Sequence, residues 1–106
     1  REVDLGSEAA LLARLEGADP VVFQLQRREY QLRKMDTGLV AHSTICPHLL
    51  GPLTDADLVA GRLRCPWHGY EFDMASGECV FPADASCKLA SPPILEHRQG
   101  RIIARS

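Results

Sequence analysis

The sequence predicts an all-β protein that carries one short helix near its N-terminal end. After Asp19-Pro20 the chain consists of short stretches of β-branched and apolar residues, separated by polar or glycine-containing turns. The last two stretches are joined by Arg98-Gln99-Gly100, a short glycine-containing connection that is typical of a β-hairpin. Before residue 19, apolar residues recur at helical spacing.

The expected helix covers residues 8–15. Ser7 stands where an N-cap is expected, because its hydroxyl can accept a hydrogen bond from a free backbone N–H of the first turn. Leu11, Leu12 and Leu15 then recur at helical spacing, and Gly17 marks the end of the helix. We expect this helix to pack on the core rather than to bind a partner.

The remaining elements are expected to be β-strands. A meander is predicted first, with a charged turn at Arg27, Arg28 and Glu29. Residues 45–73 are rich in Pro, Gly, Cys and His and interrupt the strand pattern, so one piece of the chain is inserted in another. The predicted strands are 21–25, 30–35, 39–42, 87–89, 94–97 and 101–104.

Composition limits the possible classes of protein. A chain of 106 residues is long enough for one domain with a modest core. A formal net charge of -2 with the signs well mixed gives no basic patch, so we expect neither nucleic acid nor a membrane surface as a partner. No apolar run approaches the roughly 18 residues of a membrane span, and the N-terminal residues do not resemble a signal peptide. We therefore expect a cytoplasmic location.

Two short motifs combine one cysteine with one histidine each. They are Cys46-Pro47-His48 and Cys65-Pro66-Trp67-His68, separated by residues 49–64. Such spacings allow two side chains from one tight turn to converge on a metal centre. Two Cys and two His also suit a structural zinc site. Zinc fingers, however, usually pair two Cys in one turn and two His in the other, whereas here each turn contributes one of each.

The motifs resemble the paired cluster-binding loops of the Rieske [2Fe-2S] family. CPHLLGPL and CPWHGYEFD are similar to the loops of Rieske ferredoxins and of the Rieske domains of ring-hydroxylating oxygenases. In a Rieske centre two Cys hold one iron and two His hold the other, so each loop supplies one ligand to each iron. The resemblance implies one [2Fe-2S] cluster per chain, with Cys46, His48, Cys65 and His68 as its ligands. A structural zinc module remains the alternative.

The resemblance also implies the arrangement of the domain. We expect residues 1–106 to form a single Rieske domain of stacked antiparallel sheets, in which a cluster-binding subdomain, about 44–76, is inserted in a larger β base. The N-terminal helix has no counterpart in this expectation. Cys79 and Cys87 fall outside the ligand set, and we expect them to be reduced structural thiols.

Several positions around the motifs predict a low-potential, ferredoxin-type centre. High-potential Rieske proteins carry one further Cys in each loop, and the two form a disulfide; Gly51 and Trp67 stand at these positions here. They also place a Ser and a Tyr after the second His, and here these positions hold Tyr70 and Phe72. Phe72 has no hydroxyl to donate to the cluster. We therefore expect a potential near the low end of the Rieske range, roughly -150 mV.

The resemblance implies an electron carrier rather than an enzyme, without catalytic residues of its own. We expect electrons to pass from a reductase to a terminal oxygenase through the exposed edges of His48 and His68. An oxygenase needs a second, 2-His-1-carboxylate iron site, and only His42 and His97 remain for one. The alternative is a Rieske domain or small subunit of a larger oxidoreductase, either a ring-hydroxylating oxygenase or a nitrite-reductase-like complex.

The surface around the histidines is expected to be apolar and to contact the redox partner. Leu49, Leu50, Pro52 and Trp67 are the candidates for this surface. Small and transient contacts suit a carrier that dissociates from its partner after each transfer. We also expect the chain to be a monomer.

Overall fold

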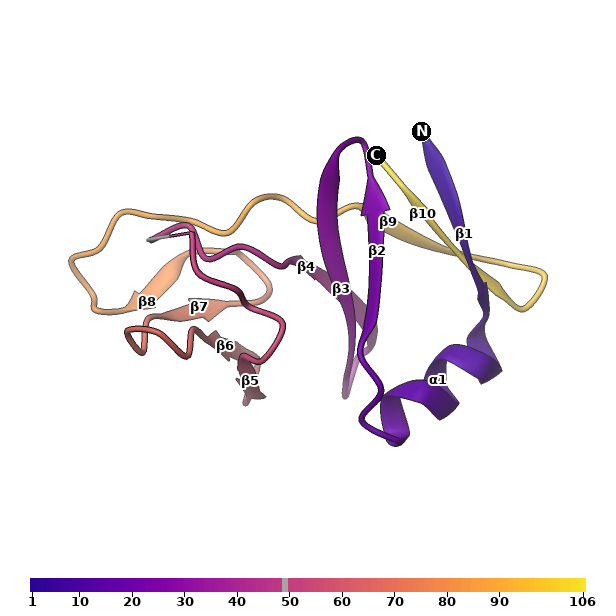
Figure 1. The fold of residues 1–106 in the computed structure, drawn as a ribbon, viewed down its shortest axis with the longest axis horizontal. Coiled ribbons are helices and arrows are strands. Elements are labelled where there is room, and N and C mark those ends of the chain that lie inside the picture. The colour runs from indigo at the N-terminus through magenta and orange to yellow at the C-terminus, as the bar shows by residue number, and fades with distance from the viewer. Residues whose placement is uncertain (49) are drawn as a thin grey trace. The chain divides into compact units, whose positions relative to one another are not determined.

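The computed structural model describes residues 1–106 except residue 49. The chain forms two compact units: residues 1–41 with 92–106, and residues 42–91 (Figure 1). The second unit is one continuous segment, so the chain leaves the first unit and returns to it. This unit extends beyond the expected 44–76, because residues as far as Leu89 pack in its core.

The described residues form ten short strands and one helix, which confirms the predicted all-β class with one short helix. In the first unit, strand β1 (Glu2–Ser7) pairs with β10 (Arg101–Arg105), and β10 pairs with β9 (Ile94–Arg98), all antiparallel. The two-residue turn between β9 and β10, Gln99-Gly100, has both φ angles positive, at 51° and 77°. This is the geometry that the favoured type I′ hairpin requires.

The second sheet of this unit has the order β2 (Val21–Leu25), β3 (Arg28–Met35), β4 (Gly38–Ser43). Residues of β2 alternate between buried and exposed, as a strand with one covered face should. The turn to β3 consists of Gln26-Arg27, both with positive φ, rather than of the expected residues 27–29. The predicted strand at 30–35 therefore begins two residues earlier, at Arg28.

Helix α1 (Glu8–Glu16) confirms the predicted helix. The Ser7 hydroxyl accepts a hydrogen bond from the Ala10 N–H at 3.2 Å, and Gly17 is the C-cap. Leu11 is buried in a core cluster with Leu32 and other side chains of the first unit. Within the described part of the chain, no helix is long and apolar enough to cross a membrane.

The second unit holds a four-stranded antiparallel sheet of very short strands. Their order is β5 (Asp57–Val59), β6 (Arg62–Arg64), β7 (Glu71–Asp73), β8 (Cys79–Phe81). The predicted strand at 87–89 is wrong, because only Lys88 pairs, in an isolated bridge to Glu78.

Candidate metal centre

The first motif forms a tight loop closed by its own backbone. The Cys46 N–H donates a hydrogen bond to the Gly51 carbonyl at 2.7 Å, and the Leu50 N–H donates to the Cys46 carbonyl at 2.8 Å. Leu50 lies in the left-handed region, with a φ of 60°. A side chain there costs roughly 1–2 kcal/mol, so the surrounding contacts must hold this conformation in place.

The second motif repeats this backbone pattern. The Cys65 N–H donates to the Tyr70 carbonyl at 2.8 Å, and the Gly69 N–H donates to the Cys65 carbonyl at 3.0 Å. Gly69, four residues after the cysteine like Leu50 in the first loop, is also left-handed, with a φ of 70°. The two loops thus hold their cysteines in equivalent backbone positions.

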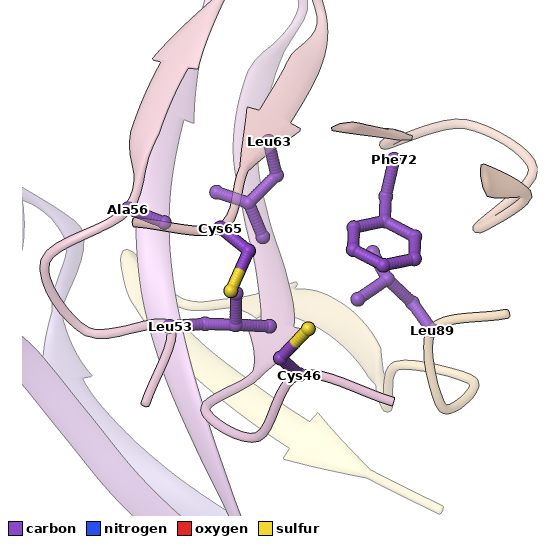
Figure 2. Close-up of a cluster of buried hydrophobic side chains, with 7 residues drawn as sticks. All are labelled: Cys46, Leu53, Ala56, Leu63, Cys65, Phe72 and Leu89. Carbon is purple, nitrogen blue, oxygen red and sulfur yellow. The ribbon is translucent and has the colours of Figure 1, made fainter. Parts of the chain in front are cut away.

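The two thiols are the inner part of the site. Cys46 is 1% exposed and Cys65 is 2% exposed, and both belong to the core cluster of the second unit. Figure 2 shows the two side chains entering from separate loops, with their sulfur atoms directed into the same space. The core cluster consists of Cys46, Leu53, Ala56, Leu63, Cys65, Phe72 and Leu89.

The two imidazoles are the outer part of the site. The ring centroids of His48 and His68 lie 5.2 Å apart and their planes are nearly perpendicular, at 86°. His48 is half-buried and His68 is exposed. A Rieske cluster needs two thiolates on one iron and two imidazoles on the other, so buried thiols beside more exposed imidazoles fit this ligand set. Among the residues other than 49, no three His, Cys, Asp or Glu side chains are grouped as a single metal ion would require.

Tyr70 has a role that the sequence did not suggest. Its ring stacks on that of His48, with centroids 3.8 Å apart and an interplanar angle of 10°. This contact joins the second loop to the first and fixes the plane of the His48 ring. In the sequence, only an aromatic residue two positions after His68 pointed to this contact, and its partner lies in the other motif.

Trp67 is exposed but contacts the other ligand loop. Its side chain is 58% exposed, so it does not belong to the core. Its ring lies against Gly51, where an added Cβ atom would be 2.7 Å from Cδ2 of Trp67. The two positions at which high-potential members carry a disulfide are therefore in contact here without a covalent bond.

The remaining histidines and cysteines lie outside the pair of loops. His97 belongs to the first unit, is exposed, and its Nε2 lies 2.7 Å from a carboxylate oxygen of Glu8. His42 is buried, with Nδ1 2.8 Å from the Ser43 carbonyl oxygen. Cys79 and Cys87 are free thiols that pack against the core cluster of the second unit.

Comparison with known proteins identifies the family. The family model of the Rieske [2Fe-2S] domain matches residues 3–93. The oxygenase component of dicamba O-demethylase from Stenotrophomonas maltophilia is 41% identical over 70 residues, which cover 60% of this chain and 20% of that protein. The chain therefore spans about a fifth of that relative's length.

Solved structures share the fold of this chain. A crystal structure of dicamba monooxygenase bound to 3,6-dichlorosalicylic acid superposes with a TM-score of 0.65 and 34% identity, covering 80% of this chain and 26% of the other. The ferredoxin of carbazole 1,9a-dioxygenase from Nocardioides aromaticivorans IC177 superposes with a TM-score of 0.73 at 19% identity, covering 98% and 96%. The predicted family is confirmed: the chain belongs to the Rieske [2Fe-2S] domain family, whose cofactor is one [2Fe-2S] cluster per domain.

Proposed function

We propose that this chain is a one-electron carrier in which Cys46 and Cys65 hold one iron of the cluster and His48 and His68 hold the other. The observation that carries the proposal is the division of the site into buried thiols and more exposed imidazoles, supplied by two loops of equivalent backbone geometry. When bound, a [2Fe-2S] cluster accepts and releases a single electron.

The residues of the chain determine where that electron can leave. The core around Cys46 and Cys65 keeps water from the thiolates, so this side of the centre is insulated. The exposed ring of His68 and the half-buried ring of His48 are the parts of the site that a partner can approach. Tyr70 keeps the His48 ring in one orientation, which limits rearrangement during transfer.

The proposed partners are a reductase as donor and a terminal oxygenase as acceptor. The ferredoxin of carbazole 1,9a-dioxygenase, matched over almost its whole length, is by its name a component of an oxygenase system. Near the histidines, Leu50 is 75% exposed and Trp67 is 58% exposed, and Pro52 is exposed as well. Together they offer an apolar contact surface for a weak complex. Leu49, also expected in this surface, lies outside the described residues.

A second function is supported by a different observation. In the superposed structures, the identity to dicamba monooxygenase is 34%, against 19% for the carbazole dioxygenase ferredoxin. This favours a Rieske domain of a larger oxidoreductase, which delivers its electron within the same protein. The mass of the polypeptide in its native source distinguishes the two: a chain near 106 residues supports the carrier, and one several times longer with mononuclear iron supports the domain.

Metal analysis tests the ligand set. We expect a red-brown protein with two irons and two inorganic sulfides per chain, and replacement of a ligand by His68→Cys should abolish the normal spectrum, because thiolate is a stronger donor than imidazole. The matched control His97→Cys should leave the spectrum and the iron content unchanged, because His97 lies in the other unit. A colourless protein with stoichiometric zinc and no sulfide would support the zinc module instead.

Electron transfer is measured with the oxygenase isolated from the same source. The dithionite-reduced chain should be reoxidised by that oxygenase in a stopped-flow mixing experiment, without itself changing any substrate. If the reduced chain transfers no electron to an oxygenase or to any other co-isolated redox protein, the carrier is excluded. That the chain is a monomer and that it is located in the cytoplasm remain predictions.

A further inference from the structure

The segment after β8 turns back and runs antiparallel to the start of that strand. Glu78 and Lys88 form an antiparallel bridge, and the Leu89 N–H donates a hydrogen bond to the Gly77 carbonyl at 2.8 Å. Both contacts fit one antiparallel register, in which moving one residue along the first segment moves the paired residue one position back in the second.

The next step of this register places Cys79 opposite Cys87. Burial is the main cause that raises the pKa of the Cys79 thiol, and the neighbouring Cys87 raises it further. The Cys79 thiol also donates to the Phe81 carbonyl at 3.3 Å. Both cysteines are half-buried and pack against the same core cluster.

This position suits a covalent bond between the two sulfur atoms. Opposite residues of an antiparallel pair have Cα atoms about 4.5–5.5 Å apart, and a disulfide needs Cα atoms about 4.4–6.8 Å apart. The pair can therefore be bridged without a large movement of the backbone. Neither thiol belongs to the ligand set, so the bond would leave all four proposed ligands in place.

We propose that Cys79 and Cys87 are a redox-active dithiol that forms a reversible disulfide with small-molecule disulfides such as oxidised glutathione. One thiol loses its proton and attacks the small disulfide, forming a mixed disulfide and releasing one small thiol. The second cysteine loses its proton and attacks the mixed disulfide, displacing the other small thiol. The two cysteine sulfurs are thereby oxidised by two electrons in total, and the small disulfide is reduced to two thiols.

The bond braces the unit that holds the proposed ligands. It ties β8 to the segment that leads to Leu89, and Leu89 packs in one core cluster with Cys46 and Cys65. A cross-link restricts the opening of the segment that it closes. Iron bound by the second unit should therefore be lost more slowly from the oxidised protein than from the reduced one.

The test uses the iron-loaded protein and oxidised glutathione, without oxygen. After alkylation of free thiols, a protease that cleaves before aspartate separates residue 79, in peptide 73–83, from residue 87, in peptide 84–106. We expect these two peptides to remain joined, with the loss of two hydrogens, and to separate on addition of dithiothreitol. Recovery of both peptides alkylated, or each carrying glutathione, overturns the proposal.

Single variants separate the two steps. In Cys79→Ser the attack by Cys87 has no resolving thiol, so the protein should keep one glutathione, and Cys87→Ser should do the same on Cys79. Transfer of iron to a chelator should be about twofold or more slower from the cross-linked protein than from reduced wild type. Equal rates would overturn the bracing role, and a variant that never retains glutathione would overturn the two-step exchange.

Discussion

The indole of Trp67 lies directly against Gly51, and a Cβ atom at residue 51 would be 2.7 Å from Cδ2 and 2.8 Å from Cε3 of that ring. These two residues come from the two different ligand loops. Their contact requires glycine at position 51, because no side chain fits beneath the ring. Packing thus joins the loops where a disulfide joins them in high-potential members of the family.

Gly51→Ala should separate the two loops. Overpacking typically costs about 1–3 kcal/mol, and for a domain of this size each kcal/mol lowers the thermal midpoint by roughly 4–8 °C. Trp67 is the single tryptophan of the chain, so its fluorescence reports on the contact. In a Trp67→Ala background the same change should be nearly neutral. Gly17→Ala, where the nearest atoms lie at 3.6 Å, is the control, and an equal loss there would contradict the clash.

The potential depends on the hydrogen-bond donors around the thiolates. Phe72 is fully buried in the core cluster with Cys46 and Cys65 and supplies no hydroxyl. Wild type should have a midpoint of roughly -150 mV that varies little with pH near neutrality. Phe72→Tyr should raise the midpoint by about 60 mV, which corresponds to a tenfold change in equilibrium for one electron.

Protein-film voltammetry measures both values. Phe72→Leu is the control, because it changes the packing without adding a donor and should leave the midpoint almost unchanged. A wild-type midpoint well above 0 mV, or a steep pH slope at pH 7, would show that the low-potential interpretation is wrong.

Electron transfer to the acceptor should depend on the apolar surface near the histidines. Leu50→Glu introduces a charge on a side chain that is 75% exposed, so the fold and the cluster spectrum should be retained while transfer slows several-fold. Val59→Glu, on a side chain that is 68% exposed in β5, is the control and should have little effect. Stopped-flow electron-transfer rates are measured at low and physiological salt. A many-fold fall of the wild-type rate with salt would indicate that charge steering, rather than the apolar surface, guides docking.

An ion-pair network on β1, β9 and β10 predicts a pH dependence of the first unit. The Arg98 guanidinium lowers the pKa of Glu2, and Arg98 first and Arg105 next lower the pKa of Glu96 below the ordinary 4.5. Because both pKa values are lower in the folded chain, the ion pairs stabilise it above about pH 4.5, and this contribution is lost as the pH falls below that value. Glu2 and Arg98 are exposed and Glu96 and Arg105 are half-buried at the surface, so the effect is small and sensitive to salt.

Arg98→Gln should move the titration midpoints of both carboxylates upward in a carbon-13 NMR titration. Lys34→Gln removes the same charge from an exposed position of β3 and should leave the two midpoints where they are. If both variants shift Glu2 and Glu96 equally, net charge rather than the ion pairs sets these pKa values.

The amino-acid sequence was sufficient for the family and for the elements that depend on neighbouring residues. The order Cys-x-His and Cys-x-x-His is a local property, and it distinguishes a Rieske loop pair from a zinc finger before any fold is known. Strand β2 and helix α1 were likewise predictable, because alternation and capping are set by residues a few positions apart.

Tertiary structure decided the features whose partners are far apart in the chain. Residues 2–7 carry a weak strand pattern with two acidic residues and a glycine, and they form β1 because β10 offers its free edge from the other end of the chain. The contacts of His48 with Tyr70 and of Gly51 with Trp67, and the bridge between Glu78 and Lys88, each join two different segments. The periodicity of a sequence predicts which face of a segment is apolar. Which segments pack together depends on the whole unit, because a buried side chain is stabilised by every neighbour that covers it.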